Sequence, residues 1–127
     1  MLKILILDDD PFFLTLLKRE IHNIMKDFAQ EASVSIYDTE DNFFKDYISA
    51  VDIIFLDYHL GNITSEPILK KILAMHPKQN VVMLSGQDDG NIVLGLIRMG
   101  IRNYVIKDEE HYKNIKEIIQ EELELKK

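Results

Sequence analysis

The chain of 127 residues has the length of one compact domain, and its apolar fraction of 46% is enough to build a buried core. Its formal net charge of −7 predicts a surface that repels nucleic acids and anionic membranes, so direct nucleic-acid binding and membrane association are not expected. The sequence has no cysteine, which excludes disulfides, thiolate zinc sites and thiol nucleophiles. No apolar run approaches the roughly 20 residues of a membrane helix. The start also lacks the pattern of a signal peptide, so we expect one cytoplasmic domain over residues 1–127.

Short apolar segments alternate with segments of helical periodicity along the whole chain. The predicted strands are rich in Ile, Val and Leu, as in a parallel sheet that is buried on both faces; they are residues 2–7, 33–37, 51–56, 80–84 and 102–106. The predicted helices lie between and after them, at 11–28, 41–49, 65–75, 89–99 and 109–125. In the first helix, Phe13 and Leu17 begin an apolar face, and Asp10 is a favourable N-cap before a proline. This alternation predicts a doubly wound α/β sheet with right-handed crossovers.

Polar residues whose side chains can bind ions or react follow four of the predicted strands. Asp8 and Asp9 follow the first strand, Asp57 the third, Ser85 the fourth and Lys107 the fifth. In doubly wound sheets the functional crevice lies beyond the carboxyl ends of the strands. We therefore expect these five side chains to gather at one edge of the sheet.

Three carboxylates in such a cluster repel one another, so the cluster either holds protons at neutral pH or binds a cation. Carboxylate oxygens favour a hard ion such as Mg²⁺, which retains several waters and accepts a phosphate oxygen. Beside such an ion, Lys107 would act as a point charge for a phosphate group and the Ser85 hydroxyl would donate a hydrogen bond to it. A carboxylate oxygen of Asp57 is a candidate nucleophile, because aspartyl phosphate is a known covalent form.

Four strings in order, ILILDDDPFFLTLL, IIFLDYHL, VVMLSG and GIRNYVIKD, together resemble the receiver domains of two-component response regulators. The resemblance covers nearly the whole chain with the family's spacing. It implies a flavodoxin-like (βα)5 fold, a five-stranded parallel sheet with strand order 2-1-3-4-5. It also implies a phosphorylation-dependent signalling switch of a phosphorelay. Such a domain is a regulatory phosphoprotein that catalyses only its own phosphotransfer and autodephosphorylation, and is not an enzyme acting on other substrates.

The resemblance also assigns roles to individual residues. Asp57 corresponds to the phosphoacceptor. The implied Mg²⁺ site takes Asp9 as a direct ligand, Asp8 mainly through water, Asp57 itself and the backbone carbonyl of His59. Ser85 corresponds to the switch hydroxyl and Tyr104 to the switch aromatic, while Lys107 pairs with the phosphoryl group. The implied donor is a phosphohistidine on a sensor histidine kinase or a histidine phosphotransfer protein. The implied surface for a homodimer or an output domain is the face of residues 89–125.

The sequence departs from the family pattern around the site. Gly61 and Ser65 stand where many receivers have a proline and a glycine, and Gly61 is expected to supply a turn by another backbone route. Asp108 stands where many receivers have a proline after a cis peptide, so we expect a trans bond or an altered loop here. His59 and Gln87 occupy positions that influence phosphoryl loss in the family, and we hypothesise that they set the lifetime. The remaining histidines, His22, His76 and His111, are predicted to be surface residues.

Two other functions fit parts of the sequence. The run Asp8 to Asp10 after a strand also resembles the start of haloacid-dehalogenase-type phosphatases, with Asp8 as nucleophile. However, Phe12 stands where that family has a hydroxyl, and the chain is short for that fold with its cap. The second alternative is a pseudo-receiver that is never phosphorylated and serves only protein contacts. The presence of all five strand-end groups argues against this second alternative.

Overall fold

The computed structural model describes residues 1–86 and 89–127 and contains the predicted parallel sheet. Its strands are β1 (Leu2–Leu7), β2 (Ala32–Tyr37), β3 (Ile53–Asp57), β6 (Val81–Ser85) and β7 (Asn103–Ile106). All neighbours are parallel and their order is β2-β1-β3-β6-β7, which confirms the predicted order. β3 and β6 are buried at every residue, as expected for strands covered on both faces, whereas the edge strand β2 is only partly buried.

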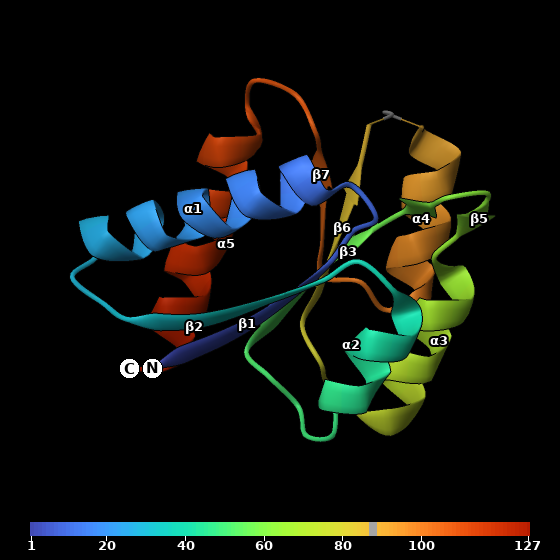
Figure 1. The fold of residues 1–127 in the computed structure, drawn as a ribbon, viewed down its shortest axis with the longest axis horizontal. Coiled ribbons are helices and arrows are strands. Elements are labelled where there is room, and N and C mark those ends of the chain that lie inside the picture. Colours follow the sequence, from blue (N-terminus) through green and yellow to red (C-terminus); the bar gives the residue numbers. More distant parts are fainter. Residues whose placement is uncertain (87–88) are drawn as a thin grey trace.

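Two layers of helices cover the sheet (Figure 1). The helices are α1 (Pro11–Asp27), α2 (Glu40–Asp46), α3 (Glu66–Met75), α4 (Gly90–Met99) and α5 (His111–Leu125). α1 and α5 pack on one face, and α2, α3 and α4 pack on the other. Side chains of β1 alternate between these two cores, because successive residues of a strand point to opposite faces: Ile4 and Ile6 meet α1 and α5, and Leu5 and Leu7 meet the other helices.

The helix boundaries follow from local side chains. The Asp10 carboxylate accepts the backbone N–H of Phe12 at 2.9 Å, so α1 begins with the predicted N-cap. The second helix ends at Asp46, three residues earlier than predicted. It stops because Tyr47 leaves the helical conformation to bury its ring (1% exposed) and to donate its hydroxyl to Gln79 Oε1 at 2.9 Å.

A small antiparallel hairpin that the sequence pattern did not predict follows β3. It consists of β4 (His59–Leu60) and β5 (Ile63–Thr64), and two-residue strands are too short to show a period. Gly61 has a φ of +64° in its turn, which confirms that this glycine supplies a turn by its own backbone freedom. The hairpin therefore brings a backbone turn over the end of the sheet.

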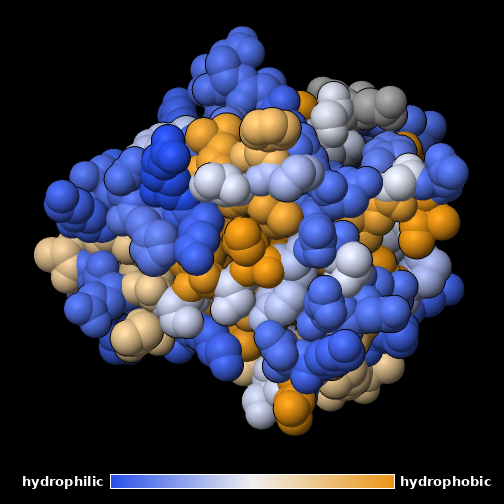
Figure 2. Space-filling model, in the orientation of Figure 1, coloured by the Kyte–Doolittle hydropathy of each residue, from blue (hydrophilic) through white to orange (hydrophobic). Residues whose placement is uncertain are grey.

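The two termini lie side by side at the amino ends of the strands (Figure 1). Asp8 and Asp57 lie at the opposite, carboxyl ends of β1 and β3. At the amino ends, Asp52 precedes β3, which begins at Ile53, two residues later than predicted. The Asp52 carboxylate accepts the backbone N–H of Lys3 at 2.6 Å and pairs with Lys126 at 2.5 Å. The visible surface is largely hydrophilic with smaller apolar areas between (Figure 2). Within residues 1–86 and 89–127, no helix combines the length and apolar character needed to cross a membrane.

Candidate functional site

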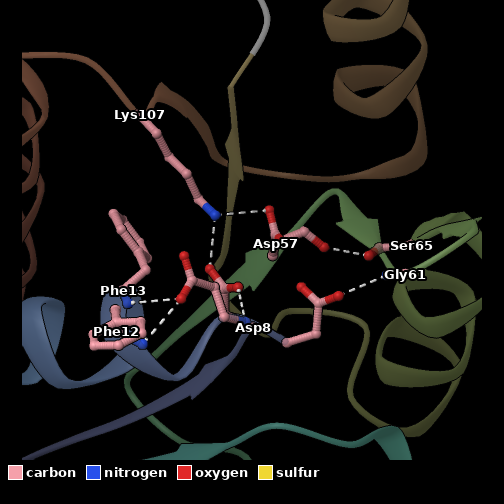
Figure 3. Close-up of polar contacts among 9 residues, drawn as sticks. Asp8, Phe12, Phe13, Asp57, Gly61, Ser65 and Lys107 are labelled. Atoms are coloured by element: carbon pink, nitrogen blue, oxygen red, sulfur yellow. Dashed lines mark hydrogen bonds and ion pairs between the residues drawn. The ribbon is translucent and has the colours of Figure 1, made fainter.

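The carboxyl ends of the sheet strands bring the predicted polar groups to one edge. Asp57 is the last residue of β3 and Ser85 the last of β6, while Asp8 and Lys107 directly follow β1 and β7. Parallel register explains the convergence, because Leu7 lies opposite Leu56 and Asp57 lies opposite Leu84. Residues separated by about a hundred positions in the sequence thus share one site (Figure 3).

The two acidic residues after β1 have different surroundings. Asp8 is fully buried; its Oδ1 accepts the backbone N–H of Asp10 at 2.9 Å, and its Oδ2 accepts the Lys107 ammonium at 2.7 Å. Asp9 is exposed, and its Oδ2 accepts the backbone N–H of Gly61 at 2.8 Å. Asp8 is therefore fixed on both oxygens, whereas Asp9 faces solvent and ties the hairpin to the site.

Asp57 lies between these carboxylates and the lysine. Its side chain is nearly buried, with the residue 6% exposed, and its Oδ1 is 3.2 Å from the Lys107 ammonium. The backbone carbonyl of Asp57 accepts a hydrogen bond from the hydroxyl of Ser65, which is fully buried. Ser65 also donates its backbone N–H to the Tyr58 carbonyl at 2.9 Å, so it fixes the chain immediately after β3 (Figure 3).

The electrostatics of the site favour a cation. Burial and the negative charge of Asp8 raise the pKa of Asp57 from 3.8 to about 7, although Lys107 opposes this. Burial alone would lower the pKa of Lys107, but the hydrogen bond to Asp8 and the charges of both carboxylates raise it overall, so the ammonium stays protonated. One oxygen each from Asp8, Asp9 and Asp57 lie within 4.8 Å of one another. Oxygens on opposite sides of a Mg²⁺ ion are about 4.2 Å apart, so small side-chain movements fit this donor set to the ion.

An aromatic ring that the sequence assigned to the helix face also contacts the site. The Lys107 ammonium lies 4.3 Å from the centroid of the Phe13 ring, a cation–π geometry. Sequence periodicity predicted Phe13 as an apolar residue of the first helix and carried no signal for this contact. The lysine is thus held between two carboxylates and one ring.

The remaining predicted site residues have different positions. Ser85 is 1% exposed, and Tyr104 of β7 is half-buried and packs against the core on the α2–α4 side. His59 is exposed, with its ring edge-on to Tyr58 at 4.8 Å between centroids. Gln87 lies outside the described residues. The Lys107–Asp108 peptide is trans, as predicted, since the described residues contain no cis bond.

One histidine predicted to be a surface residue is largely covered. The His111 side chain is 16% exposed, because its ring lies between α1 and α5 and contacts the Glu20 carboxylate at 2.8 Å. The prediction was wrong for this residue, since the position of α1 relative to the start of α5 is set by tertiary packing alone.

Comparison with known proteins decides the family. Residues 4–120 match the family model of the response regulator receiver domain. The chain belongs to this family. As a receiver it is a regulatory phosphoacceptor domain, and the phosphatase alternative is not favoured.

Relatives and solved structures of receivers agree with this. The chemotaxis protein CheY of Listeria monocytogenes is 29% identical over 107 residues, covering 84% of this chain and 87% of the relative, and CheY of Listeria innocua matches equally. A receiver domain protein of Clostridium thermocellum superposes with a TM-score of 0.82 at 19% identity, over 99% of this chain and 97% of the other. The response regulator TrrA of Thermotoga maritima, solved with Mg²⁺ and BeF, has a TM-score of 0.78 at 19% identity, over 96% and 99% of the chains. The receiver fold is therefore shared over the full length.

Proposed function

We propose that this receiver accepts a phosphoryl group on Asp57 in a Mg²⁺-dependent reaction and so acts as a signalling switch. The observation that supports it most directly is the position of the Asp57 carboxylate, which lies beside two further carboxylates and 3.2 Å from an ammonium. A nucleophile that must approach a phosphoryl group needs its own charge and that of the phosphoryl oxygens balanced, and this set of groups provides the balance.

The donor in this proposal is a phosphohistidine of a sensor kinase or a phosphotransfer protein. A carboxylate oxygen of Asp57 attacks phosphorus, the P–N bond breaks, and its electron pair returns to the imidazole of the donor. When the switch is turned off, water attacks phosphorus and the P–O bond to Asp57 breaks, which releases phosphate and restores the carboxylate. This autodephosphorylation is the only hydrolysis that we assign to the domain, and we keep the hypothesis that His59 and Gln87 set its rate.

Mg²⁺ would be held by Asp9 and Asp57 directly, by Asp8 through water and by the His59 carbonyl, and it supplies charge neutralisation at the phosphoryl oxygens. Lys107 would transfer its contact from Asp57 Oδ1 to a phosphoryl oxygen. The Ser85 hydroxyl would donate to a second phosphoryl oxygen, and Tyr104 would turn inward as Ser85 moves. In the register of β6 and β7, Met83 lies opposite Tyr104 and Ser85 lies opposite Ile106, so Tyr104 is diagonal to Ser85 across the two strands.

The output of the switch would be read on the face of residues 89–125, by a second copy or by an output domain. Large apolar side chains of α4 are exposed there, with Leu94 at 48% and Ile97 at 52%. Tyr104 lies on the strand between α4 and α5, so its movement would alter this face. DrrB of Thermotoga maritima, which this chain covers over 54% of its length, is an example of a longer response regulator.

The test is incorporation from acetyl phosphate and Mg²⁺, measured as intact mass. We expect the wild type to gain one phosphoryl group, Asp57→Asn to gain none, and the control Asp38→Asn, an exposed carboxylate after β2, to behave as wild type. Asp8→Asn tests the phosphatase alternative. If Asp8 were the nucleophile, Asp8→Asn would abolish incorporation and Asp57→Asn would not. A fully modified Asp57→Asn protein would refute the proposal. Absence of any Mg²⁺-dependent change at Tyr104 with beryllofluoride would favour the pseudo-receiver.

A further inference from the structure

One histidine ring connects the backbone of the loop that carries Lys107 to α1. His111 Nδ1 lies 2.7 Å from the backbone carbonyl oxygen of Asp108, and its Nε2 lies 2.8 Å from Glu20 Oε1 and 3.1 Å from Oε2. Asp108 directly follows Lys107, and Glu20 belongs to α1. The ring therefore joins the loop between β7 and α5 to the helix on the same face of the sheet.

Both partners of this ring are acceptors only. A carbonyl oxygen and a carboxylate have no proton to donate, so each ring nitrogen must carry a hydrogen for both contacts to be hydrogen bonds. A neutral ring has one N–H and would place a lone pair against an oxygen at the other position. The observed geometry consequently requires the doubly protonated, positively charged ring.

The charges around the ring agree with this requirement. Burial lowers the pKa of His111, but the hydrogen bond to Glu20, the bond to the Asp108 backbone and the charges of Glu20 and Asp108 raise it overall above 6.5. The N-terminus of α5 opposes a positive charge at this position. Glu20 and Asp108 are the charged side chains that raise the pKa of the ring, and both of them are negative.

The same ring contacts the aromatic residue that supports the lysine. The rings of Phe13 and His111 have centroids 5.9 Å apart, and the Lys107 ammonium lies 4.3 Å from the centroid of the same Phe13 ring. His111 thus touches both supports of Lys107, namely the backbone of its loop and the ring beneath its ammonium. Loss of either hydrogen bond of His111 breaks this connection between the backbone of the loop and α1.

We propose that His111 is a positioning residue for Lys107, and that its doubly protonated ring, held by Glu20, couples phosphoryl uptake to pH. This inference rests on the proposed role of Asp57 and Lys107. Deprotonation of the ring removes one of the two bonds, the loop shifts, and the ammonium loses its place beside Asp57. Uptake then slows as pH rises, independently of other titrations in the site.

Glu20→Gln tests the idea, because an amide is both donor and acceptor. Its NH₂ group donates to the Nε2 of a neutral ring and its carbonyl accepts from a charged one, so this variant satisfies His111 at every pH. The rate of uptake from acetyl phosphate with Mg²⁺ is measured for both proteins between about pH 6 and about pH 9, a range that spans the titration of histidine. Taking the ratio of the two rates removes the pH dependence of the donor and of Asp57.

We expect the ratio of wild-type to Glu20→Gln rates to be near one at low pH and to fall on the order of tenfold at high pH, as when a supporting residue is lost. His22→Gln, an exposed histidine of α1, is the control and should retain the wild-type profile. A ratio of rates that is constant with pH would overturn the proposal. A loss of the same factor at every pH would indicate a merely structural role of Glu20.

A second measurement does not depend on phosphorylation. Nitrogen NMR of the ring should show protons on both nitrogens of His111 at neutral pH, and the Lys107 Nζ signal should change with the ring titration in wild type but not in Glu20→Gln. A neutral ring at about pH 6.5, the ordinary midpoint of histidine, would overturn the inference. If Asp57→Asn still incorporates phosphoryl, the proposed function fails, whereas these NMR signals still decide the role of His111.

Discussion

Ionised Asp57 destabilises the fold when no cation is bound beside it. Burial and the charge of Asp8 raise the pKa of Asp57 from 3.8 to about 7. Between these pH values the folded protein holds a proton that the unfolded chain has released, so the free energy of unfolding falls as pH rises and levels off above about pH 7. The interval of about three pH units corresponds to about 4 kcal/mol, an upper bound because Asp57 titrates together with its neighbours.

Asp57→Asn keeps the size of the side chain and removes its ionisation. In EDTA, we expect the free energy of unfolding of wild type to fall by about 2 kcal/mol relative to that of Asp57→Asn as pH rises from about 4 to about 8. Urea denaturation followed by circular dichroism measures both proteins. The exposed control Asp38→Asn should show no such gain, because its carboxylate is solvated.

Mg²⁺ should oppose this effect in wild type. An ion that binds only the folded state adds about 2.7 kcal/mol at a hundredfold excess over its Kd, and the variant lacks one of the proposed ligands. The reasoning would be refuted by a stability difference that does not change with pH, or by a wild type more stable than Asp57→Asn at high pH in EDTA. Either outcome would mean that Asp57 is not desolvated beside a second charge.

Two further predictions concern stability. Ser65→Ala removes the buried hydroxyl that donates to the Asp57 carbonyl and should lower the free energy of unfolding by about 1–2 kcal/mol in urea denaturation, whereas the exposed Ser33→Ala should change it little; equal values for both would contradict the role of the hydroxyl. Gly100→Ala should cost about 1 kcal/mol or more in thermal unfolding, because Gly100 has a φ of +119° and its Cβ would lie 3.0 Å from a side-chain carbon of α3. Gly95→Ala in the middle of α4 meets open space and should instead stabilise by up to about 1 kcal/mol; a loss at Gly95 equal to that at Gly100 would refute the backbone argument.

The sequence by itself determined the sheet and the polar residues of its edge. Apolar runs without alternation predict buried parallel strands, and a parallel sheet places all its carboxyl ends together. Asp8, Asp57 and Lys107 were therefore predictable as one cluster, because each directly follows or ends such a run. Gly61 was predictable as a turn because its backbone freedom is a property of the residue itself.

The contacts that tune this cluster were decided only by the tertiary structure. Phe13 has helical periodicity whether or not it touches Lys107, and Ser65 has no pattern that reveals its bond to the Asp57 carbonyl. The His111–Glu20 pair joins residues 91 positions apart, so it depends on how α1 and the start of α5 pack. Local periodicity indicates which face of a helix is buried, but the crossing angles between helices and the side-chain rotamers determine which atoms come into contact. The cluster at the strand ends thus follows from the sequence, whereas the support of its lysine by one ring and one histidine follows from packing.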